Sequence, residues 1–357
     1  MSHKGIPLGW IFAGIMVAVT GAVAIPPLRG EADPAYQPRA VEVSEEWAGT
    51  VAVQHLRDNS FRYLVNGKPQ VFIGMGYNPI YRYLTDGERS ANYDRDFSIL
   101  CEAGVNHIVG WDSDKGYEQD KFDEITLDYA QKYGIGVIMP FYLEAFGDYT
   151  DSAYRQKLLD EAAAKVSRFK DHPALRMWGI GNEVLLDGLP VEQQAAFWDF
   201  YLELADLFRA LDTDHPVIYR DSEDVFLPQI SEAIQDSLQE RPWLLYGMNV
   251  YTRELDRIVE DWPEYGLGGP LFVTEFGSEP EEYGGRGAGY ASMWRKIRSH
   301  PGYVMGGAPY VWTTEGPEPT DTKWGLMDGN ATPIDDAFEL LKAEWLKEVG
   351  AARSCAP

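Results

Sequence analysis

The stretch "LRMWGIGNEV", residues 175–184, decides how the fold of this chain is read. Its first residues are bulky and apolar, as in a buried β-strand. It then places two glycines in front of Asn182 and Glu183, although glycine and a bare carboxylate are both disfavoured inside a strand. A strand that ends in a functional site explains this order of residues.

Seven further apolar runs are expected strands, and amphipathic helical patterns separate them. They cover residues 70–77, 106–111, 136–143, 216–221, 244–251, 270–277 and 303–312. Several are apolar on both faces, as parallel strands covered on both sides are. Eight strand–helix repeats predict an α/β fold, a (β/α)8 TIM barrel of a single domain. The alternative is an open doubly wound sheet, but "GMGYNP" after the first strand is not its phosphate-binding loop.

The N-terminal sequence predicts export to the periplasm or the extracellular space. Lys4 precedes a long uncharged run, and "AVA" at Ala22–Ala24 resembles a signal-peptidase site. The run is also long enough to span a bilayer, so residues 1–27 are either a signal peptide or a membrane anchor. Residues 28–50 are expected to form a polar linker or arm, and residues 51–350 the barrel.

Composition narrows the choice of partner and cofactor. The formal net charge of −25 argues against a nucleic-acid partner and favours a neutral ligand. Cys101 is expected to be a small buried core residue and Cys355 to lie in a frayed C-terminus. We therefore expect no disulfide framework, no metal site and no cofactor, since no metal-ligand or nucleotide motif is present.

The two ends of the predicted barrel should differ in role. "FRYLVNGKPQVF", residues 61–72, contains the hairpin-forming pair Asn66–Gly67 and is expected to close the bottom. TIM barrels carry their functional residues at the opposite face, where the strands end. The residues at those ends are polar or aromatic and include Asn182, Glu183, Asn249, Tyr251, Glu275 and Trp312.

Two of these residues, Glu183 after the fourth strand and Glu275 in the seventh, carry the functional hypothesis. A single glutamate at a strand end is ordinarily a solvated loop residue. Two carboxyl groups around one mouth are what glycoside hydrolysis needs, one as acid and base and the other as nucleophile or base. The pattern therefore favours a glycosidase with a carbohydrate substrate.

Four motifs also resemble a known family. "HPALRMWGIGNEV", "PLFVTEFGSE", "YGMNVYTRE" and "TKWGLMDGNATPIDDAFELLKAEW" are similar to the acid/base motif, the nucleophile strand, the sixth strand and the closing segment of glycoside hydrolase family 2. This family belongs to clan A, the retaining (β/α)8 glycosidases. The similarity extends over residues 61–346.

The resemblance implies a role for each motif residue. Glu183 would be the acid/base, Glu275 the nucleophile and Asn182 a hydrogen-bond partner of the sugar 2-hydroxyl. Tyr251 would hold the Glu275 carboxylate, and Trp312 would form the floor of the subsite where cleavage occurs. Further residues expected to bind substrate are Asn249, Trp111, Asn78 and Glu144.

The chain departs from the family pattern in two ways. Family members carry an arginine near the end of the second strand, where this chain has Val109. The nucleophile is therefore expected to lack a cationic neighbour, and Trp111 or Asp112 to line the site instead. The β-sandwich domains that precede the barrel in the family are also missing, which predicts a stand-alone barrel.

These observations predict an exported retaining β-glycosidase that acts on oligo- or polysaccharides through two glutamates. One alternative is a β-glucan transglycosylase that uses the same residues. The other is a non-catalytic glycan-binding barrel, which the missing strand-two arginine favours and the intact pair of glutamates disfavours.

Overall fold

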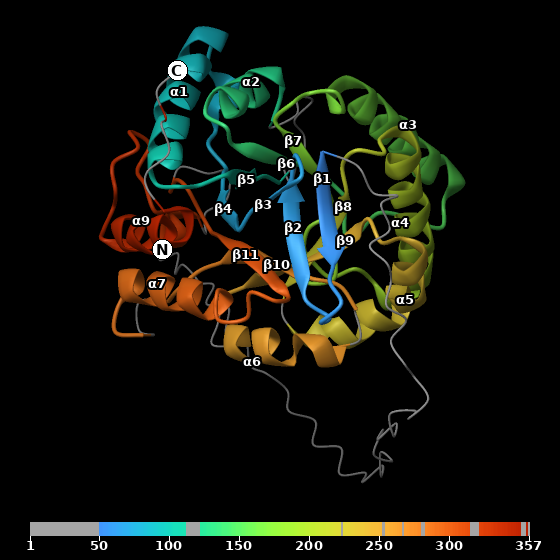
Figure 1. Ribbon diagram of the computed structural model, residues 1–357. Helices are drawn as coiled ribbons and strands as arrows, with labels where there is room; N and C mark the ends of the chain where they lie inside the picture. The colour runs from blue at the N-terminus through green and yellow to red at the C-terminus, as the bar shows by residue number, and fades with distance from the viewer. Residues whose placement is uncertain are drawn as a thin grey trace, which may run out of the picture. The chain divides into compact units, whose positions relative to one another are not determined.

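A closed barrel of eight parallel strands forms the centre of the chain in the computed structural model (Figure 1). The structure describes residues 50–111, 122–222, 224–251, 254–265, 268–279, 283–314, 321–350 and 355. The barrel strands are β4 (Phe72–Gly76), β5 (His107–Val109), β6 (Gly136–Phe141), β7 (Leu175–Ile180), β8 (Val217–Ser222), β9 (Leu244–Val250), β10 (Leu271–Phe276) and β11 (Val304–Pro309). Strand β11 pairs with β4, so the sheet closes. The (β/α)8 prediction is confirmed, and the open doubly wound sheet is excluded.

Helices surround the barrel as an outer ring (Figure 1). They are α1 (Asp86–Glu102), α2 (Glu124–Lys132), α3 (Ser152–Phe169), α4 (Val191–Leu211), α5 (Leu227–Glu240), α6 (Glu254–Asp261), α7 (Arg286–Ile297), the short α8 (Asp321–Trp324) and α9 (Ala337–Val349). The first helix starts at a capping box, in which Thr85 accepts from the backbone N–H of Glu88 and the Glu88 carboxylate accepts from that of Thr85. Asp123 and Asp151 cap α2 and α3 in the simpler way, each with its carboxylate.

Two apolar layers hold these elements together. In β6, Val137 and Met139 pack in the outer layer against the helices, whereas Ile138 between them packs in the inner layer. This alternation follows from the two-residue period of a strand. The inner layer also contains Val109 and Phe272, so the lumen is a packed core, as in other TIM barrels.

A small antiparallel sheet covers the end of the barrel where the strands begin. It consists of β1 (Val51–His55), β2 (Phe61–Val65) and β3 (Lys68–Pro69) in that order. Asn66 and Gly67 both have positive φ, at 50° and 72°, as a type I′ hairpin turn requires. Tyr63 of β2 bonds to His107 at the start of β5 (2.7 Å), which confirms the predicted cover.

The expectation that Cys101 and Cys355 are unpaired is wrong, because they form a disulfide. Cys101 is buried near the end of α1, as predicted. The two cysteines are 254 residues apart, so spacing gave no sign of the bond. Closure of the barrel brings the end of α9 back to the end of α1, where a side chain at Gly104 would lie 3.2 Å from Val349.

The predicted export segment and linker, residues 1–27 and 28–50, lie outside the described residues except for Thr50. Within the described ranges, no helix is both long and apolar enough to cross a membrane. Asp112, which the sequence offered as a neighbour of the site, also lies outside the description.

Removal of the disulfide should destabilise the barrel. The bond closes a very long loop, and such cross-links typically contribute about 2–4 kcal/mol. We expect Cys355→Ser to lower the free energy of unfolding by this amount in urea titrations. The wild-type protein in reducing buffer should match the variant, and the double variant Cys101→Ser/Cys355→Ser should not respond to reductant. Equal stability of the oxidised and reduced wild type would contradict the expectation.

Candidate active site

The loop that follows β7 explains the glycines and the carboxylate of the opening motif. Gly181 has a φ of 71° and Glu183 a φ of 51°, so both adopt the left-handed conformation. This conformation is unusual for a residue with a side chain, and such residues are concentrated at functional sites. The N–H of Gly181 donates to the carbonyl of Phe141 (2.9 Å), and that of Glu183 to the carbonyl of Arg220 (3.2 Å). The loop is therefore anchored to strands on both sides.

Gly179 serves a neighbouring side chain rather than the turn. A Cβ atom at this position would lie 3.1 Å from Nη2 of Arg220 and 3.1 Å from Cγ2 of Ile138. The strand thus lacks a side chain at the place where the guanidinium of Arg220 passes.

Asn249 at the end of β9 connects the two motifs that carry glutamates. Its Nδ2 lies 3.0 Å from Oε1 of Glu183 and 3.1 Å from Oδ1 of Asn182. The hydroxyl of Thr274 donates to its Oδ1 (2.8 Å), which fixes the orientation of the amide. Asn249 is also the register partner of Glu275 in β10.

Glu275 is almost fully buried, with 3% of its surface exposed. The hydroxyl of Tyr251 donates a short hydrogen bond to its Oε2. The Tyr251 ring in turn packs against Trp324 and Tyr310, with centroids 5.0 and 5.8 Å apart. Tyr310 packs edge-on against Trp111 at 5.3 Å. Aromatic rings from the segments after β5, β9 and β11 and from α8 therefore form a connected set that begins at the tyrosine bound to the nucleophile candidate.

The two carboxyl groups do not titrate independently. Burial raises the pKa of Glu183 to about 7; Asn249 opposes this shift, and Asp221 and Asp187 add to it. Burial and the negative charge of Glu183 raise the pKa of Glu275, whereas Tyr251, Arg220 and Trp111 oppose that rise. Because the two carboxyls repel each other, each holds its proton to a higher pH than an isolated glutamate does. A proton donor beside an ionised partner is what a retaining pair requires.

The structure brings most of the predicted residues to the same mouth, but Trp312 is an exception. Only 1% of Trp312 is exposed, and its indole N–H donates to Asp96 (3.1 Å), which also accepts from Tyr77. The chain leaves the strand after Pro309, so Tyr310 rather than Trp312 presents its half-buried ring beside Tyr251. Trp312 therefore supports the first strand end, and its predicted place as a floor for substrate stays a prediction.

Asn78 and Glu144 follow the ends of two other strands. Asn78 is buried two residues after β4. Glu144 follows β6, and its backbone carbonyl accepts from the hydroxyl of Tyr149 (2.7 Å). Glu144 also adds to the effect of burial that raises the pKa of Tyr142 to about 12. Both residues follow strand ends, as expected, and their contact with substrate stays a prediction.

Arg220 of β8 and Tyr310 are the residues that sequence reasoning missed. Burial raises the pKa of Glu275, and the positive charge of Arg220 opposes that rise, so the expectation that the nucleophile lacks a cationic neighbour is wrong. An arginine inside an expected parallel strand is unusual, because such strands are apolar on both faces. That mismatch in "PVIYRD" was the available signal.

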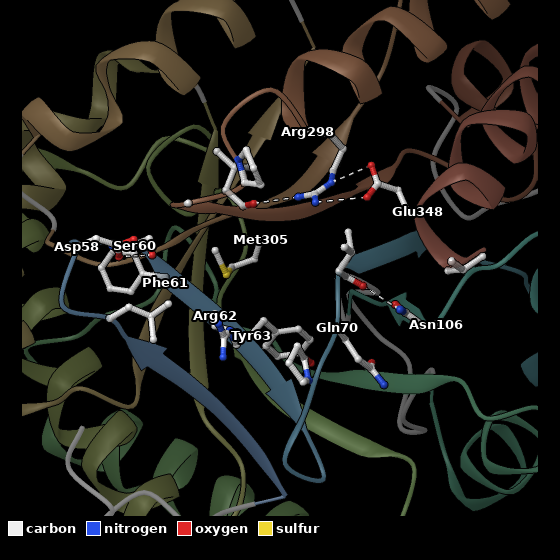
Figure 2. A pocket seen from close by; sticks show the side chains of 17 residues that line it. Asp58, Ser60, Phe61, Arg62, Tyr63, Gln70, Asn106, Arg298, Met305 and Glu348 are labelled. Carbon is white, nitrogen blue, oxygen red and sulfur yellow. Dashed lines mark hydrogen bonds and ion pairs between the residues drawn. The ribbon is translucent and has the colours of Figure 1, made fainter. Parts of the chain in front are cut away.

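A pocket of about 710 Å³ at the other end of the barrel does not belong to this site. It lies between the small antiparallel sheet and the starts of the strands, and Tyr63, Asn106, Met305 and Arg298 help to line it (Figure 2). Arg298 is neutralised there by Glu348. Nowhere in the described ranges do three or more metal-ligating side chains gather around a point.

Two carboxyl groups at the C-terminal mouth of a TIM barrel, here the buried Glu275 and the partly buried Glu183, define the type of site that glycoside hydrolases use. A sequence model of "Glycosyl hydrolases family 2, TIM barrel domain" matches residues 119–306, which is more than half of the chain. The chain therefore belongs to glycosyl hydrolase family 2. This confirms the resemblance found in the sequence motifs.

Relatives found by sequence comparison match this chain over only part of their own length. The chain is 24% identical to a β-glucuronidase of Rattus norvegicus over 254 residues, which is 66% of this chain and 35% of the relative. It is 27% identical to a β-mannosidase of Bos taurus over 145 residues, or 41% of this chain and 15% of the relative. The chain thus spans about a third of the rat enzyme.

Solved structures share the fold at lower identity. A β-glucuronidase of Bifidobacterium dentium, complexed with coumarin-3-O-glucuronide, superposes with a TM-score of 0.62 at 20% identity. The match covers 86% of this chain and 50% of that structure. This likeness supports the barrel and nothing finer.

The raised pKa of Glu183 predicts a pH-dependent effect on stability. In the unfolded chain this carboxyl ionises near pH 4.5, but in the folded protein it keeps its proton up to about pH 7. Ionisation therefore costs stability as the pH rises through this window. Glu183→Gln removes that cost, so it should raise the free energy of unfolding by about 1–3 kcal/mol at pH 8 and by little at pH 4.5.

Urea denaturation at the two pH values tests this expectation. Glu192→Gln, at an exposed position in the first turn of α4, is the matched control and should have a small effect at both. An equal effect of Glu183→Gln at pH 4.5 and pH 8 would contradict the raised pKa.

Proposed function

We propose that this chain is a retaining β-glycosidase in which Glu183 is the acid/base and Glu275 the nucleophile. The observation that carries the proposal is the link through Asn249, which bonds to Glu183 and is the register partner of Glu275. Membership of glycosyl hydrolase family 2 supports hydrolysis of β-glycosides as the reaction class. Retaining enzymes hold the two carboxyls about 5–5.5 Å apart, and a contact through one intervening asparagine suits that spacing.

In the first step, a Glu275 oxygen attacks the anomeric carbon while the bond to the leaving-group oxygen breaks. Glu183 transfers its proton to that oxygen, so the leaving group departs as a neutral alcohol. The product is a glycosyl ester of Glu275. Tyr251 already donates to the Glu275 carboxylate and would select the oxygen that remains free to attack.

In the second step, a water molecule enters on the side of Glu183, which is now ionised and accepts a proton from it. The water oxygen attacks the anomeric carbon and displaces Glu275, so the configuration is retained over the two steps. The pKa of Glu183, raised by burial to about 7, suits both donation and acceptance near neutral pH.

The substrate class is carbohydrate with a β-linkage. The relatives are named as β-glucuronidases, a β-galactosidase and a β-mannosidase, which makes short β-glycosides the first candidates. Transfer to a second sugar in place of water would use the same two glutamates. The non-catalytic alternative loses its main support, because Arg220 provides the cation that the strand-two position lacks.

Export remains part of the proposal. The uncharged run after Lys4 supports it, and so does the disulfide between Cys101 and Cys355. Disulfides persist in oxidising compartments and are rare in the cytosol.

Substitution of the two glutamates should separate their roles. Glu275→Gln should abolish turnover of every β-glycoside in a panel of aryl glycosides, because the attacking atom is lost. Glu183→Gln should slow substrates with poor leaving groups by about 10²–10⁴-fold and activated aryl glycosides much less in the first step. Added azide should restore turnover of the Glu183→Gln variant and yield the β-glycosyl azide.

The matched control is again Glu192→Gln, which should leave turnover unchanged. Azide rescue of Glu275→Gln with retained configuration would reverse the two assignments. Full activity of both glutamine variants would show that the reaction takes place elsewhere or not at all.

Cell fractionation of a producing strain tests export. We expect the protein outside the cytoplasm with the Cys101–Cys355 bond oxidised, as measured by intact mass after thiol labelling. Retention in the membrane fraction with the N-terminal run intact would identify a membrane anchor. Loss of the N-terminal run from the exported protein would identify a cleaved signal peptide. Recovery of the full, reduced chain in the cytosol would contradict the expectation.

A further inference from the structure

The side chain of Arg220 is a buried cation that spans the barrel lumen. It starts on β8, and only 1% of its surface is exposed. Its Nη1 donates to the carbonyl of Gly110 (2.9 Å), after β5, and its Nη2 to that of Gly181 (3.3 Å), after β7. The guanidinium therefore ties together the ends of strands that are not neighbours in the barrel.

Glycines on both neighbouring strands provide the space for this side chain. A Cβ at Gly179 of β7 would lie 3.1 Å from Nη2 of Arg220, and one at Gly247 of β9 would lie 2.6 Å from the side chain of Thr274 and 3.0 Å from Cγ of Arg220. Gly247 is also the register partner of Arg220. Since glycine weakens a strand interior, two glycines around one arginine indicate that the room is needed.

The guanidinium reaches the place where the family pattern expects a different arginine. That arginine would stand at Val109, which is buried in the inner layer of the barrel. The carbonyl that accepts from Arg220 belongs to Gly110, the next residue. The positive charge thus arrives beside the strand-two position from the opposite side of the lumen.

A charge buried this deeply requires a counter-charge, because an isolated buried ion costs several kcal/mol. Among the described residues, the titratable and charged groups that act on Glu275 include Glu183, Tyr251 and Arg220. Those that face Glu183 also include Asp221 and Asp187. Arg220 is the cation in this otherwise acidic set.

We propose that Arg220 is a positioning residue that brings a positive charge into the site in place of the strand-two arginine and holds the loop of Glu183 in place. This inference rests on the proposed function, in which Glu275 must attack as a carboxylate. The hydrogen bond to Gly181 fixes the residue in front of Asn182 and Glu183, so the same guanidinium orders both halves of the site.

The test is the pH dependence of kcat/KM in Arg220→Met, with the best aryl β-glycoside of the panel as the probe. Loss of a cation near a carboxylate raises the carboxylate pKa by about 1–3 units. The acid limb of the profile should therefore shift to higher pH by that amount. At pH 5, kcat/KM should fall about 10- to 1,000-fold relative to the wild type, and this difference should become smaller at pH values above the limb. Arg220→Lys keeps the charge but loses the two-armed donor, and its limb should move less.

Arg176→Met is the matched control, because Arg176 is also a partly buried arginine of a barrel strand but binds the carbonyls of Pro173 and Leu175 where β7 begins. Its acid limb should coincide with that of the wild type. The double variant Val109→Arg/Arg220→Val should return the acid limb toward the wild-type position. If Arg220→Met does not fold, this double variant and Arg220→Lys are used for the test instead.

A limb that stays in place in Arg220→Met, or that the double variant leaves displaced, would overturn the inference. Failure of the proposed function is separate, because it would appear as full activity of Glu275→Gln. A dead Glu275→Gln variant together with an unshifted Arg220→Met profile would remove only the role of Arg220.

Discussion

Repulsion between two buried carboxyl groups is the constraint on which the site depends. Glu183 and Glu275 lie within each other's field, in surroundings too apolar to screen them. The fold must therefore supply donors and one cation, or both groups would be neutral. Tyr251 bonds to one carboxyl and Asn249 to the other, while Arg220 acts on both. Each of these partners comes from β8 or β9, the two strands that separate β7 from β10.

The placement of glycine follows from the same constraint. Gly181 supplies the left-handed turn that directs Glu183 inward, and Gly179 and Gly247 leave a channel for the guanidinium. A strand interior that gives up side-chain packing in this way loses stability locally. The apolar inner layer and the covering sheet at the other end of the barrel offset that loss. Stability and chemistry are thus divided between the two ends, as is general for TIM barrels.

Local patterns were enough to predict the barrel and the pair of glutamates, because strand periodicity and the end of each strand are visible in short windows. The hairpin turn at Asn66–Gly67 was likewise predictable, because these two residues determine the turn by themselves. Arg220 and the Cys101–Cys355 bond could not be predicted, since both depend on which distant segments the closed barrel brings together. The surroundings of Trp312 could not be predicted for a local reason: β11 ends at Pro309, so alternation no longer determines which ring faces the mouth.

The disulfide spans the seam of the barrel. A closed sheet has one joint where the last strand meets the first, and here β11 and β4 share only two register pairs. Cys101 follows β4 through α1, and Cys355 follows β11 through α9, so the covalent bond bridges that joint from the outside. The bond closes a covalent ring over residues 101–355, so a pull on the two chain ends bypasses β5 to β11 while the sulfurs stay joined. Strand β4 precedes Cys101 and lies outside this ring, so its pairing with β11 is the part of the barrel that such a pull reaches first.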